Sequence, residues 1–377
     1  MILAVLKEKA EESRVSLVPE VVKQLVQQQV TVWVEEGAGA KAFYTDDAYR
    51  EAGAVIKPRA ELLQQADLLL SIRSLVPEEW NQLAPGKILM GVYQPLYNQE
   101  LMQQWAEKQL TTFSLDTIPR TTRAQSMDVL SSQANIAGYK AVIMAAFTYS
   151  RYFPMLMTAA GSIPPAKVLI LGAGVAGLQA IATARRLGAV VEVFDTRPAV
   201  KEEVMSLGAK FVEVEGAADA SKAGGYAVEQ TEEYKQKQVE KIAQSAAKAD
   251  IIISTAQIPG KAAPILITKE MVESMHTGSV IIDLAAATGG NTAVTKNGET
   301  ILHKGVTVIG NSDLAGTAPA DASKLYARNV LNFLKLMLTK EGQLDLNFKD
   351  DLIQGTCITH QGEIVNERVK NLQPATA

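Results

Sequence analysis

One polar stretch gathers the side chains that could do chemistry, and it reads Pro-Arg-Thr-Thr-Arg-Ala-Gln-Ser-Met-Asp-Val-Leu-Ser over residues 119–131. It offers a guanidinium group (Arg120), an amide (Gln125), a carboxylate (Asp128) and a hydroxyl (Ser131), but no histidine. Such groups can orient a polar ligand through hydrogen bonds, which suits positioning rather than acid–base catalysis. We therefore expect them to line a cleft between domains. A capped helix start, with Arg120 and Asp128 as a solvated ion pair, is the alternative.

A glycine-rich turn offers a second kind of chemistry, the binding of phosphate. The apolar run 168–171 leads into Gly172-Ala-Gly-Val-Ala-Gly177, and helix formers follow. Gly172 permits the tight turn, Gly174 lets the backbone approach a pyrophosphate, and Gly177 lets helix and strand pack closely. The positive end of the helix would then face the phosphates. A strand–helix turn that binds nothing is the alternative.

The next apolar strand ends on Asp195, where a carboxylate could accept hydrogen bonds from an adenosine ribose. With the strand and helix around the glycines, this acid makes a dinucleotide the favoured ligand. A carboxylate here should repel a 2′-phosphate, so NAD is favoured over NADP. Arg197 weakens this preference, because a nearby arginine can accommodate that phosphate.

Two series of alternating strands and helices must position these motifs. Strand-like runs occur at 2–6, 30–34, 68–72, 88–92 and 111–115, and again at 168–171, 190–194, 211–214, 251–254, 280–283 and 306–309. Each series predicts a mostly parallel sheet covered by helices. No glycine-rich loop follows the first strand of the first series, where Lys7–Arg14 stands instead, so this half should not hold the dinucleotide.

The predicted fold class is α/β, with two Rossmann-like, doubly wound parallel-sheet domains joined by long helices and separated by a cleft. A helical pattern that begins at Asp321 would return the chain to the first domain. We therefore expect a discontinuous first domain of residues 1–128 and 321–377. The dinucleotide-binding domain should comprise residues 129–320.

The composition of the chain argues against several classes of function. With 377 residues the chain can form two or three domains, and its net charge of −4 gives no general attraction to nucleic acid or anionic lipid. Cys357 is the only cysteine, and His276, His303 and His360 are far apart in sequence, so neither a disulfide nor a metal site is expected. No membrane-spanning or targeting segment stands out, and we expect a soluble chain.

Residues 215–238 form a long connection whose first half has almost no large apolar side chain. Connections in α/β units are usually much shorter, so a loop of this length tends to be functional or disordered. Tyr226 follows Gly224 and Gly225 and would be the contact residue at the tip of a lid. An insertion without a role is the alternative.

Seven stretches carry a family resemblance: Arg-Ala-Gln-Ser-Met-Asp (123–128), Leu-Ser-Ser-Gln-Ala-Asn-Ile-Ala-Gly-Tyr (130–139), Ala-Ala-Gly-Ser-Ile-Pro-Pro-Ala-Lys-Val (159–168), Gly-Ala-Gly-Val-Ala-Gly (172–177), Phe-Asp-Thr-Arg (194–197), Ala-Gly-Gly-Tyr (223–226) and Ile-Pro-Gly-Lys (258–261). With them the chain resembles, over nearly its whole length, the NAD(H)-binding first domain of the proton-translocating nicotinamide nucleotide transhydrogenases. The resemblance implies that the chain holds NAD(H) and exchanges a hydride with NADP(H) on a partner domain. It further implies a homodimer that is cytoplasmic and attached peripherally to the inner membrane through the membrane subunits that couple the exchange to proton movement.

The resemblance also implies site residues. Arg120, Gln125, Asp128 and Ser131 match the catalytic loop that holds the nicotinamide end and brings the two cofactors together. The implied cofactor-binding residues are Arg120, Thr121, Thr122, Gln125, Gly172, Gly174, Val175, Ala176, Gly177, Asp195, Thr196, Arg197, Gly225, Tyr226, Gln238 and Gln257. The chain departs from the family pattern at Gln257, Ala262 and Thr292, where Leu, Pro and Cys are usual.

Hydride transfer between two nicotinamides needs orientation and exclusion of water but no acid or base, which agrees with the polar stretch. The main rival is alanine dehydrogenase, which the chain also resembles, down to its Arg14-Val-Ser-Leu-Val-Pro start. That enzyme needs a Lys and a His in its first domain, and alignment places Arg73 and Gln94 there. An arginine does not release a proton near neutral pH, and an amide is no base. Saccharopine-type dehydrogenases and a non-catalytic NAD-binding regulatory module are further alternatives.

Overall fold

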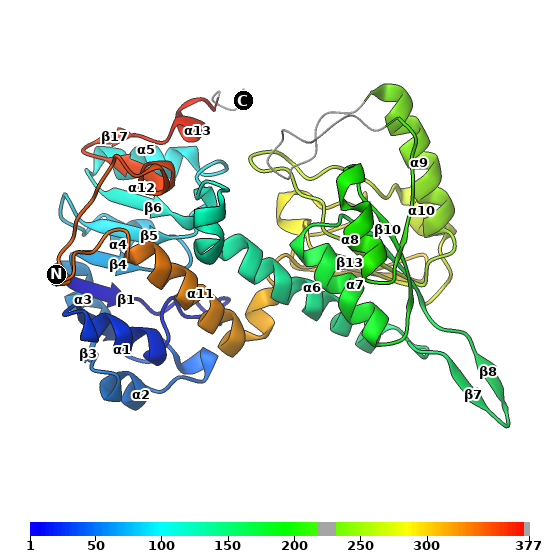
Figure 1. Ribbon diagram of the computed structural model, residues 1–377, viewed down its shortest axis with the longest axis horizontal. Coiled ribbons are helices and arrows are strands. Elements are labelled where there is room, and N and C mark those ends of the chain that lie inside the picture. Colours follow the sequence, from blue (N-terminus) through cyan, green and yellow to red (C-terminus); the bar gives the residue numbers. More distant parts are fainter. Residues whose placement is uncertain (217–230, 373–377) are drawn as a thin grey trace. The chain divides into compact units, whose positions relative to one another are not determined.

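The computed structural model describes residues 1–216 and 231–372, which form two compact units (Figure 1). Unit 1 comprises Met1–Gln133 and Gly316–Ala377, and unit 2 comprises Ala134–Ala315. Both are α/β structures on mostly parallel sheets, so the predicted fold class is confirmed. The predicted tip of the lid, Gly225 and Tyr226, lies outside the described residues.

The sheet of unit 1 has the strand order β17-β16-β6-β5-β4-β1-β2-β3. Its strands are β1 (Ile2–Val5), β2 (Thr31–Glu35), β3 (Val55–Lys57), β4 (Leu68–Leu70), β5 (Ile88–Gly91), β6 (Thr111–Ser114), β16 (Cys357–His360) and β17 (Glu363–Ile364). The strands from β3 to β6 are parallel, whereas β16 is antiparallel to β6 and β17 to β16. The sequence patterns predict β1, β2, β4, β5 and β6 but miss β3, β16 and β17, whose residues do not form the continuous apolar runs by which the other strands were found.

Alternation along the strands of unit 1 supplies two apolar faces. Leu3 and Val5 belong to a core that α1 and α11 cover, while Ala4 belongs to a second core covered by α3 and α5. Helices on both faces explain why these strands are almost uniformly apolar. The helices of this unit are α1 (Pro19–Gln27), α2 (Asp46–Glu51), α3 (Arg59–Gln65), α4 (Pro77–Trp80), α5 (Gln99–Glu107), α11 (Pro319–Leu334), α12 (Asp351–Thr356) and α13 (Glu367–Lys370).

Unit 2 repeats this plan with the strand order β11-β10-β9-β12-β13-β15-β14. Its strands are β9 (Lys167–Leu171), β10 (Val190–Phe194), β11 (Lys210–Phe211), β12 (Ile251–Ser254), β13 (Val280–Asp283), β14 (Thr300–His303) and β15 (Val306–Gly310), and its helices are α7 (Val175–Arg186), α8 (Lys201–Ser206), α9 (Glu232–Ala246) and α10 (Lys269–Ser274). All neighbours are parallel except β14 and β15. Val168 and Ile170 face one core, and Leu169 and Leu171 face the other.

Helix α6 (Val129–Thr148) begins in unit 1 and continues into unit 2. The chain then forms a hairpin of β7 (Leu156–Thr158) and β8 (Gly161–Ile163), which extends away from the sheet of unit 2 (Figure 1). Within residues 1–216 and 231–372, no helix combines the length and the apolar character needed to span a bilayer.

Candidate functional site

The glycine turn joins β9 to α7 in the geometry that its spacing predicts. Gly172 has a φ of +101°, a conformation that favours glycine, and a Cβ there would lie 2.5 Å from Thr255 Oγ1. A Cβ on Gly177 would lie 1.9 Å from the carbonyl oxygen of Gly172. Gly177 is therefore required for the close approach of α7 to the turn, and Gly172 for the close approach of the turn to Thr255, which follows β12.

Gly174 has a different environment, since a Cβ there would meet no atom of residues 1–216 or 231–372 within 4 Å. It is the residue before α7, and no side chain caps this helix end. The first N–H groups of the helix thus face open space, where the helix dipole favours an anion. This geometry fits the pyrophosphate of a dinucleotide, with Val175 and Ala176 in the first turn beside it.

Gly138 on α6 supports the same helix end, and the sequence prediction missed it. A Cβ on Gly138 would lie 2.1 Å from the carbonyl oxygen of Ala176. The backbone of α6 therefore packs directly on the first turn of α7. A lone glycine in a long helical pattern is the only signal that could have pointed to this contact.

Asp195 follows β10 and links the end of that strand to the glycine turn. Its Oδ2 accepts a hydrogen bond from Ala173 N–H at 2.7 Å. The Arg197 side chain donates to both carboxylate oxygens, from Nε at 2.9 Å and from Nη2 at 2.8 Å, and the Arg197 N–H donates to Oδ1 at 2.8 Å. The hydrogen bond to Asp195 raises the pKa of Arg197. Asp195 and Arg197 therefore form one ion pair, although the sequence predicted that the acid would disfavour NADP and the arginine would favour it. Thr196, which lies between them in the chain, is half-buried.

Helix α9 carries Gln238, and the preceding turn of this helix lies near Asp195. Gln238 lies one turn after Tyr234, whose side chain is buried. Burial raises the pKa of Tyr234, and the negative charge of Asp195 adds to this effect, so the tyrosine lies near the acid. No sequence pattern singled out Tyr234. An aromatic residue one turn before Gln238 was the available signal.

Gln257 is exposed in the loop after β12, and its Nε2 donates to the carbonyl oxygen of Leu284 at 3.1 Å. A leucine, usual at this position in the resembled family, has no group that could make this bond. The departure therefore adds a hydrogen bond between the loops that follow β12 and β13.

A buried polar network organises those two loops. Asp283 is fully buried, and its Oδ2 accepts from the N–H groups of Asn291 (2.7 Å) and Thr292 (3.2 Å) and from Thr295 Oγ1 (2.6 Å). The Asn291 side chain donates to the carbonyl oxygens of Ala256 (2.9 Å) and Pro264 (2.8 Å). Thr292 replaces a usual cysteine and bonds Thr295 Oγ1 at 2.8 Å, so its hydroxyl is part of this network. Asn291 was missed because its partners belong to the loop after β12, and Asp283 was missed because no sequence motif marks the loop whose N–H groups it accepts from.

The polar stretch belongs to unit 1. Arg120, Thr121, Thr122 and Gln125 are exposed, and the 3₁₀ helix η3 (Thr122–Met127) carries Gln125. Asp128 precedes α6, and its carboxylate accepts from Ser131 N–H at 2.9 Å and Ser131 Oγ at 2.6 Å. Asp128 and Ser131 thus form a helix cap, as expected for the capped helix start that is the alternative to a ligand-binding loop. A carboxylate so bonded can still accept a hydrogen bond from a ligand.

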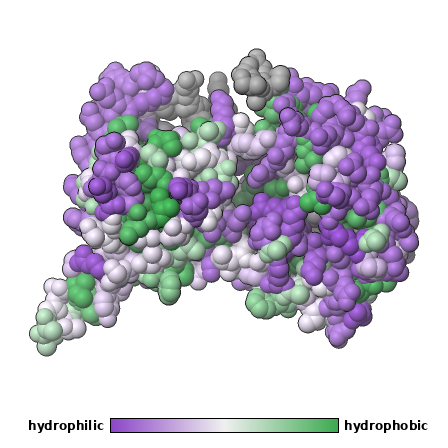
Figure 2. Space-filling view, turned by 180° about the vertical axis from the view of Figure 1, so that it is seen from behind, coloured by the Kyte–Doolittle hydropathy of each residue, from purple (hydrophilic) through white to green (hydrophobic). Residues whose placement is uncertain are grey.

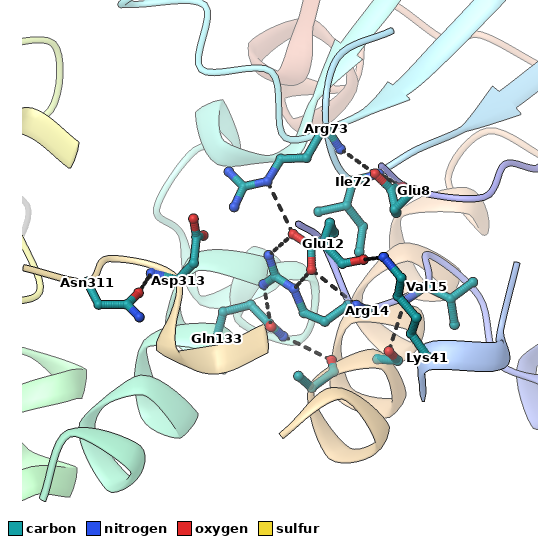
Figure 3. A network of polar contacts seen from close by, with 12 residues as sticks. Glu8, Glu12, Arg14, Val15, Lys41, Ile72, Arg73, Gln133, Asn311 and Asp313 are labelled. Atoms are coloured by element: carbon teal, nitrogen blue, oxygen red, sulfur yellow. Dashed lines mark hydrogen bonds and ion pairs between the residues drawn. The ribbon is translucent and has the colours of Figure 1, made fainter. Parts of the chain in front are cut away.

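At the end of β1, unit 1 has a network of charged side chains in place of a glycine turn (Figure 3). Glu12 is buried and accepts from Arg14 Nε (2.7 Å) and Nη2 (2.6 Å), and from Arg73 Nε at 3.2 Å. Glu8 accepts from the N–H groups of Ile72 (2.5 Å) and Arg73 (3.2 Å). Burial raises the pKa of Glu8 to about 7.

This network bears on the two positions where alanine dehydrogenase needs a lysine and a histidine. Arg73 is held by the carboxylates of Glu8 and Glu12, and Gln94 is exposed in a turn with a φ of +51°. Arg14 is paired with the buried carboxylate of Glu12, so its guanidinium could bind another anion only if this ion pair were broken. In the described residues, no three His, Cys, Asp or Glu side chains gather to hold a metal ion.

Comparison with known proteins agrees with this arrangement. The N-terminal and C-terminal domain models described as "Alanine dehydrogenase/PNT" match residues 4–137 and 141–367. The chain is 47% identical to an NAD(P) transhydrogenase alpha subunit of Rhodospirillum rubrum, over 94% of this chain and 95% of that protein. A crystal structure of transhydrogenase from Sinorhizobium meliloti has 45% identity and a TM-score of 0.89, covering 97% of this chain and all of that one.

Similarity to alanine dehydrogenases is weaker. A solved L-alanine dehydrogenase has 26% identity and a TM-score of 0.82, with 98% of both chains covered. The family resemblance found in the sequence is therefore confirmed, with the transhydrogenase branch ahead of the dehydrogenase branch. The chain belongs to the alanine dehydrogenase/PNT family of oxidoreductases and, within it, to the NAD(P) transhydrogenase alpha subunits.

Proposed function

We propose that this chain binds NAD(H) in unit 2 and is the subunit of a proton-translocating transhydrogenase that exchanges a hydride with NADP(H) held by a partner subunit. The observation that carries the proposal is the uncapped start of α7 beside the open space at Gly174. Asp195, held by Ala173, would accept the ribose hydroxyls and disfavour a 2′-phosphate. Gln238 and Gln257 would complete the nucleotide side.

The nicotinamide of bound NAD(H) supplies the chemistry, because its ring carries the transferable hydride. The chain has to hold this ring in line with a second one and to exclude water. We assign this task to Arg120, Gln125, Asp128 and Ser131, with Thr121 and Thr122 as further contacts. The Asp128–Ser131 cap fixes the start of α6, and the exposed amide of Gln125 can bond a carboxamide.

We further propose that the chain acts as a homodimer, joined to an NADP(H)-binding subunit and to membrane subunits that keep it on the cytoplasmic face of the inner membrane. The relatives are named as alpha subunits, which supports the presence of further subunits. Exposed apolar side chains support the dimer: Phe147 is 92% exposed, Met155 62% and Met157 74%. They lie at the end of α6 and along the projecting hairpin, where Figure 2 also shows apolar surface. An exposed apolar patch is typical of a protein interface.

The deciding experiment mixes the purified chain and NADH with an NADP-loaded partner subunit, and separately with pyruvate and ammonium. We expect hydride transfer in the first mixture and none in the second. Turnover only with pyruvate would identify an alanine dehydrogenase. NADH binding without turnover in either mixture would identify a regulatory module.

A further inference from the structure

The loop that carries Gln125 is clamped by a helix two hundred residues further along the chain. The carbonyl oxygen of Ser126 accepts two hydrogen bonds, from Asn329 Nδ2 at 2.8 Å and from Asn332 Nδ2 at 3.1 Å. Both asparagines lie on α11, three residues apart, and so share one face of the helix. The residue next to Gln125 is therefore fixed by two donors at once.

Apolar anchors hold the loop on either side of this clamp. Ala124 is 2% exposed and Met127 is 6% exposed, and both belong to the core that contains Tyr326 and Val330 of α11. Gln125 lies between these anchors and remains exposed. The backbone of the loop is thus held while the side chain of Gln125 stays accessible.

A second anchor reaches the loop from α12. Arg123 bonds both carboxylate oxygens of Asp350, at 2.7 and 2.6 Å, and also contacts Asp351. Asp350 itself caps α12, since its Oδ1 accepts from Leu352 N–H at 2.9 Å. The loop is therefore tied to two helices from the C-terminal part of the chain.

The environment of Asn329 indicates that its side chain does more than fill space in the core. Its side chain is 8% exposed, and within the described residues its Oδ1 is buried without a hydrogen-bond partner. An unsatisfied buried acceptor lowers stability, so an apolar residue would serve a packing role better. Within the described residues, the hydrogen bond of this side chain is the one that its Nδ2 donates to the carbonyl oxygen of Ser126.

We propose that Asn329 and Asn332 are positioning residues for hydride transfer: they fix Ser126, and with it the direction from which Gln125 meets the nicotinamide. This inference rests on the proposed function of the loop. A shift of about 1 Å in a positioned group can lower a rate by about a hundredfold, so a clamp of this kind has a measurable effect on transfer.

The test compares the single-turnover rate of hydride transfer, at saturating NADH and with an NADP-loaded partner subunit, among Asn329→Ala, Asn332→Ala and the double variant. Each single variant keeps one donor, and we expect a loss of about twofold to threefold in rate. The double variant should lose at least about tenfold, more than the product of the single losses, while the Kd for NADH changes less than about twofold. A chain with Asn329→Ala and Asn332→Gln keeps an amide donor at position 332, so it should retain most of the rate that the double alanine variant loses.

Arg328→Ala is the matched control, because Arg328 lies on α11 directly before Asn329, but its side chain pairs with Glu20 at 3.1 Å. We expect its transfer rate to equal that of the wild type. Arg123→Ala removes the second anchor at the surface and should slow transfer even if the double variant does not fold. A folded double variant with the wild-type rate would overturn the inference. If the double variant does not fold, a wild-type rate in Arg123→Ala would show that fixing this loop does not affect transfer and would overturn it as well. A wild-type chain that transfers no hydride would instead overturn the proposed function.

Discussion

The two units share one sheet topology and use it differently. In unit 1 the order β3-β2-β1-β4-β5-β6 reverses direction at β1, and in unit 2 the order β11-β10-β9-β12-β13-β15 reverses at β9. Such a reversal opens a crevice at the carboxyl ends of the strands. In unit 2 a glycine turn leaves this position open, whereas in unit 1 Glu8, Glu12 and Arg14 occupy the loop after β1. The fold offers two sites, and the loop sequence decides which one can take a ligand.

Substitutions in the glycine turn should produce the largest effect. Gly177→Ala places a methyl group 1.9 Å from a backbone oxygen, so the strand and helix must separate. We expect NADH binding to fall below detection in a fluorescence titration, and the melting temperature of unit 2 to fall. Gly174→Ala is the matched control: its methyl group meets no atom in the described part of the chain within 4 Å, so the melting temperature should be unchanged while NADH affinity falls. Equal melting temperatures for the two variants would show that the turn is not under this steric constraint.

The corresponding loop of unit 1 should make stability depend on pH. The pKa of Glu8 is raised from 4.5 to about 7 by burial, so its contribution to stability is fully present below about pH 4.5 and is lost as pH rises through 7. Over this range, the free energy of unfolding should fall by on the order of 3 kcal/mol. Denaturant unfolding of wild type and Glu8→Gln at pH 5 and pH 8 measures it, and the wild type should lose more stability than the variant. The same pH dependence in both proteins would contradict the assignment to Glu8.

The ion pair in unit 2 should control the choice between NADH and NADPH. Asp195→Asn removes the negative charge that holds Arg197 and frees the guanidinium for a 2′-phosphate. We expect NADPH affinity to rise about tenfold and NADH affinity to fall. Isothermal titration with both nucleotides gives the ratio. Arg197→Ala should move this ratio the other way, and a shift in the same direction for both variants would exclude the pair as the cause.

The smallest effect is expected when unit 1 is given the two missing residues of its dehydrogenase relatives. Arg73→Lys combined with Gln94→His supplies an amine and an imidazole, but Glu12 still neutralises Arg14 at 2.6 Å. We expect no measurable reduction of pyruvate in the presence of NADH and ammonium. Turnover by this variant would show that the charged network does not block substrate binding at the end of β1. The two units would then differ in their catalytic residues alone.

How much of the site the sequence could predict depends on the range of the contacts. The steric requirement for Gly177 is local, because a Cβ there would meet Gly172 of the same turn. The requirement for Gly172 is not local, because a Cβ there would meet Thr255, 83 residues further along the chain. The capping of α6 by Asp128 is local too, and it was among the alternatives considered. The hairpin β7–β8 was missed, since its exposed apolar residues and short strands follow neither a helical nor a buried-strand pattern. The roles of Arg120, Gln125, Asp128 and Ser131 toward a nicotinamide remain predictions.

The sequence by itself determined the two parallel sheets, the dinucleotide turn and the family, because apolar periodicity and glycine spacing act over a few residues. Only the tertiary structure decided which charges cancel and which loops are held. It paired Asp195 with Arg197, neutralised Arg14 with Glu12 and brought Asn329 to Ser126, 203 residues away along the chain. The contact of Asn329 with Ser126 follows from how α11 packs on the sheet, and no local pattern of side chains encodes it. The two ion pairs join residues only two positions apart, but the sequence does not show whether such neighbours turn toward each other or toward a ligand.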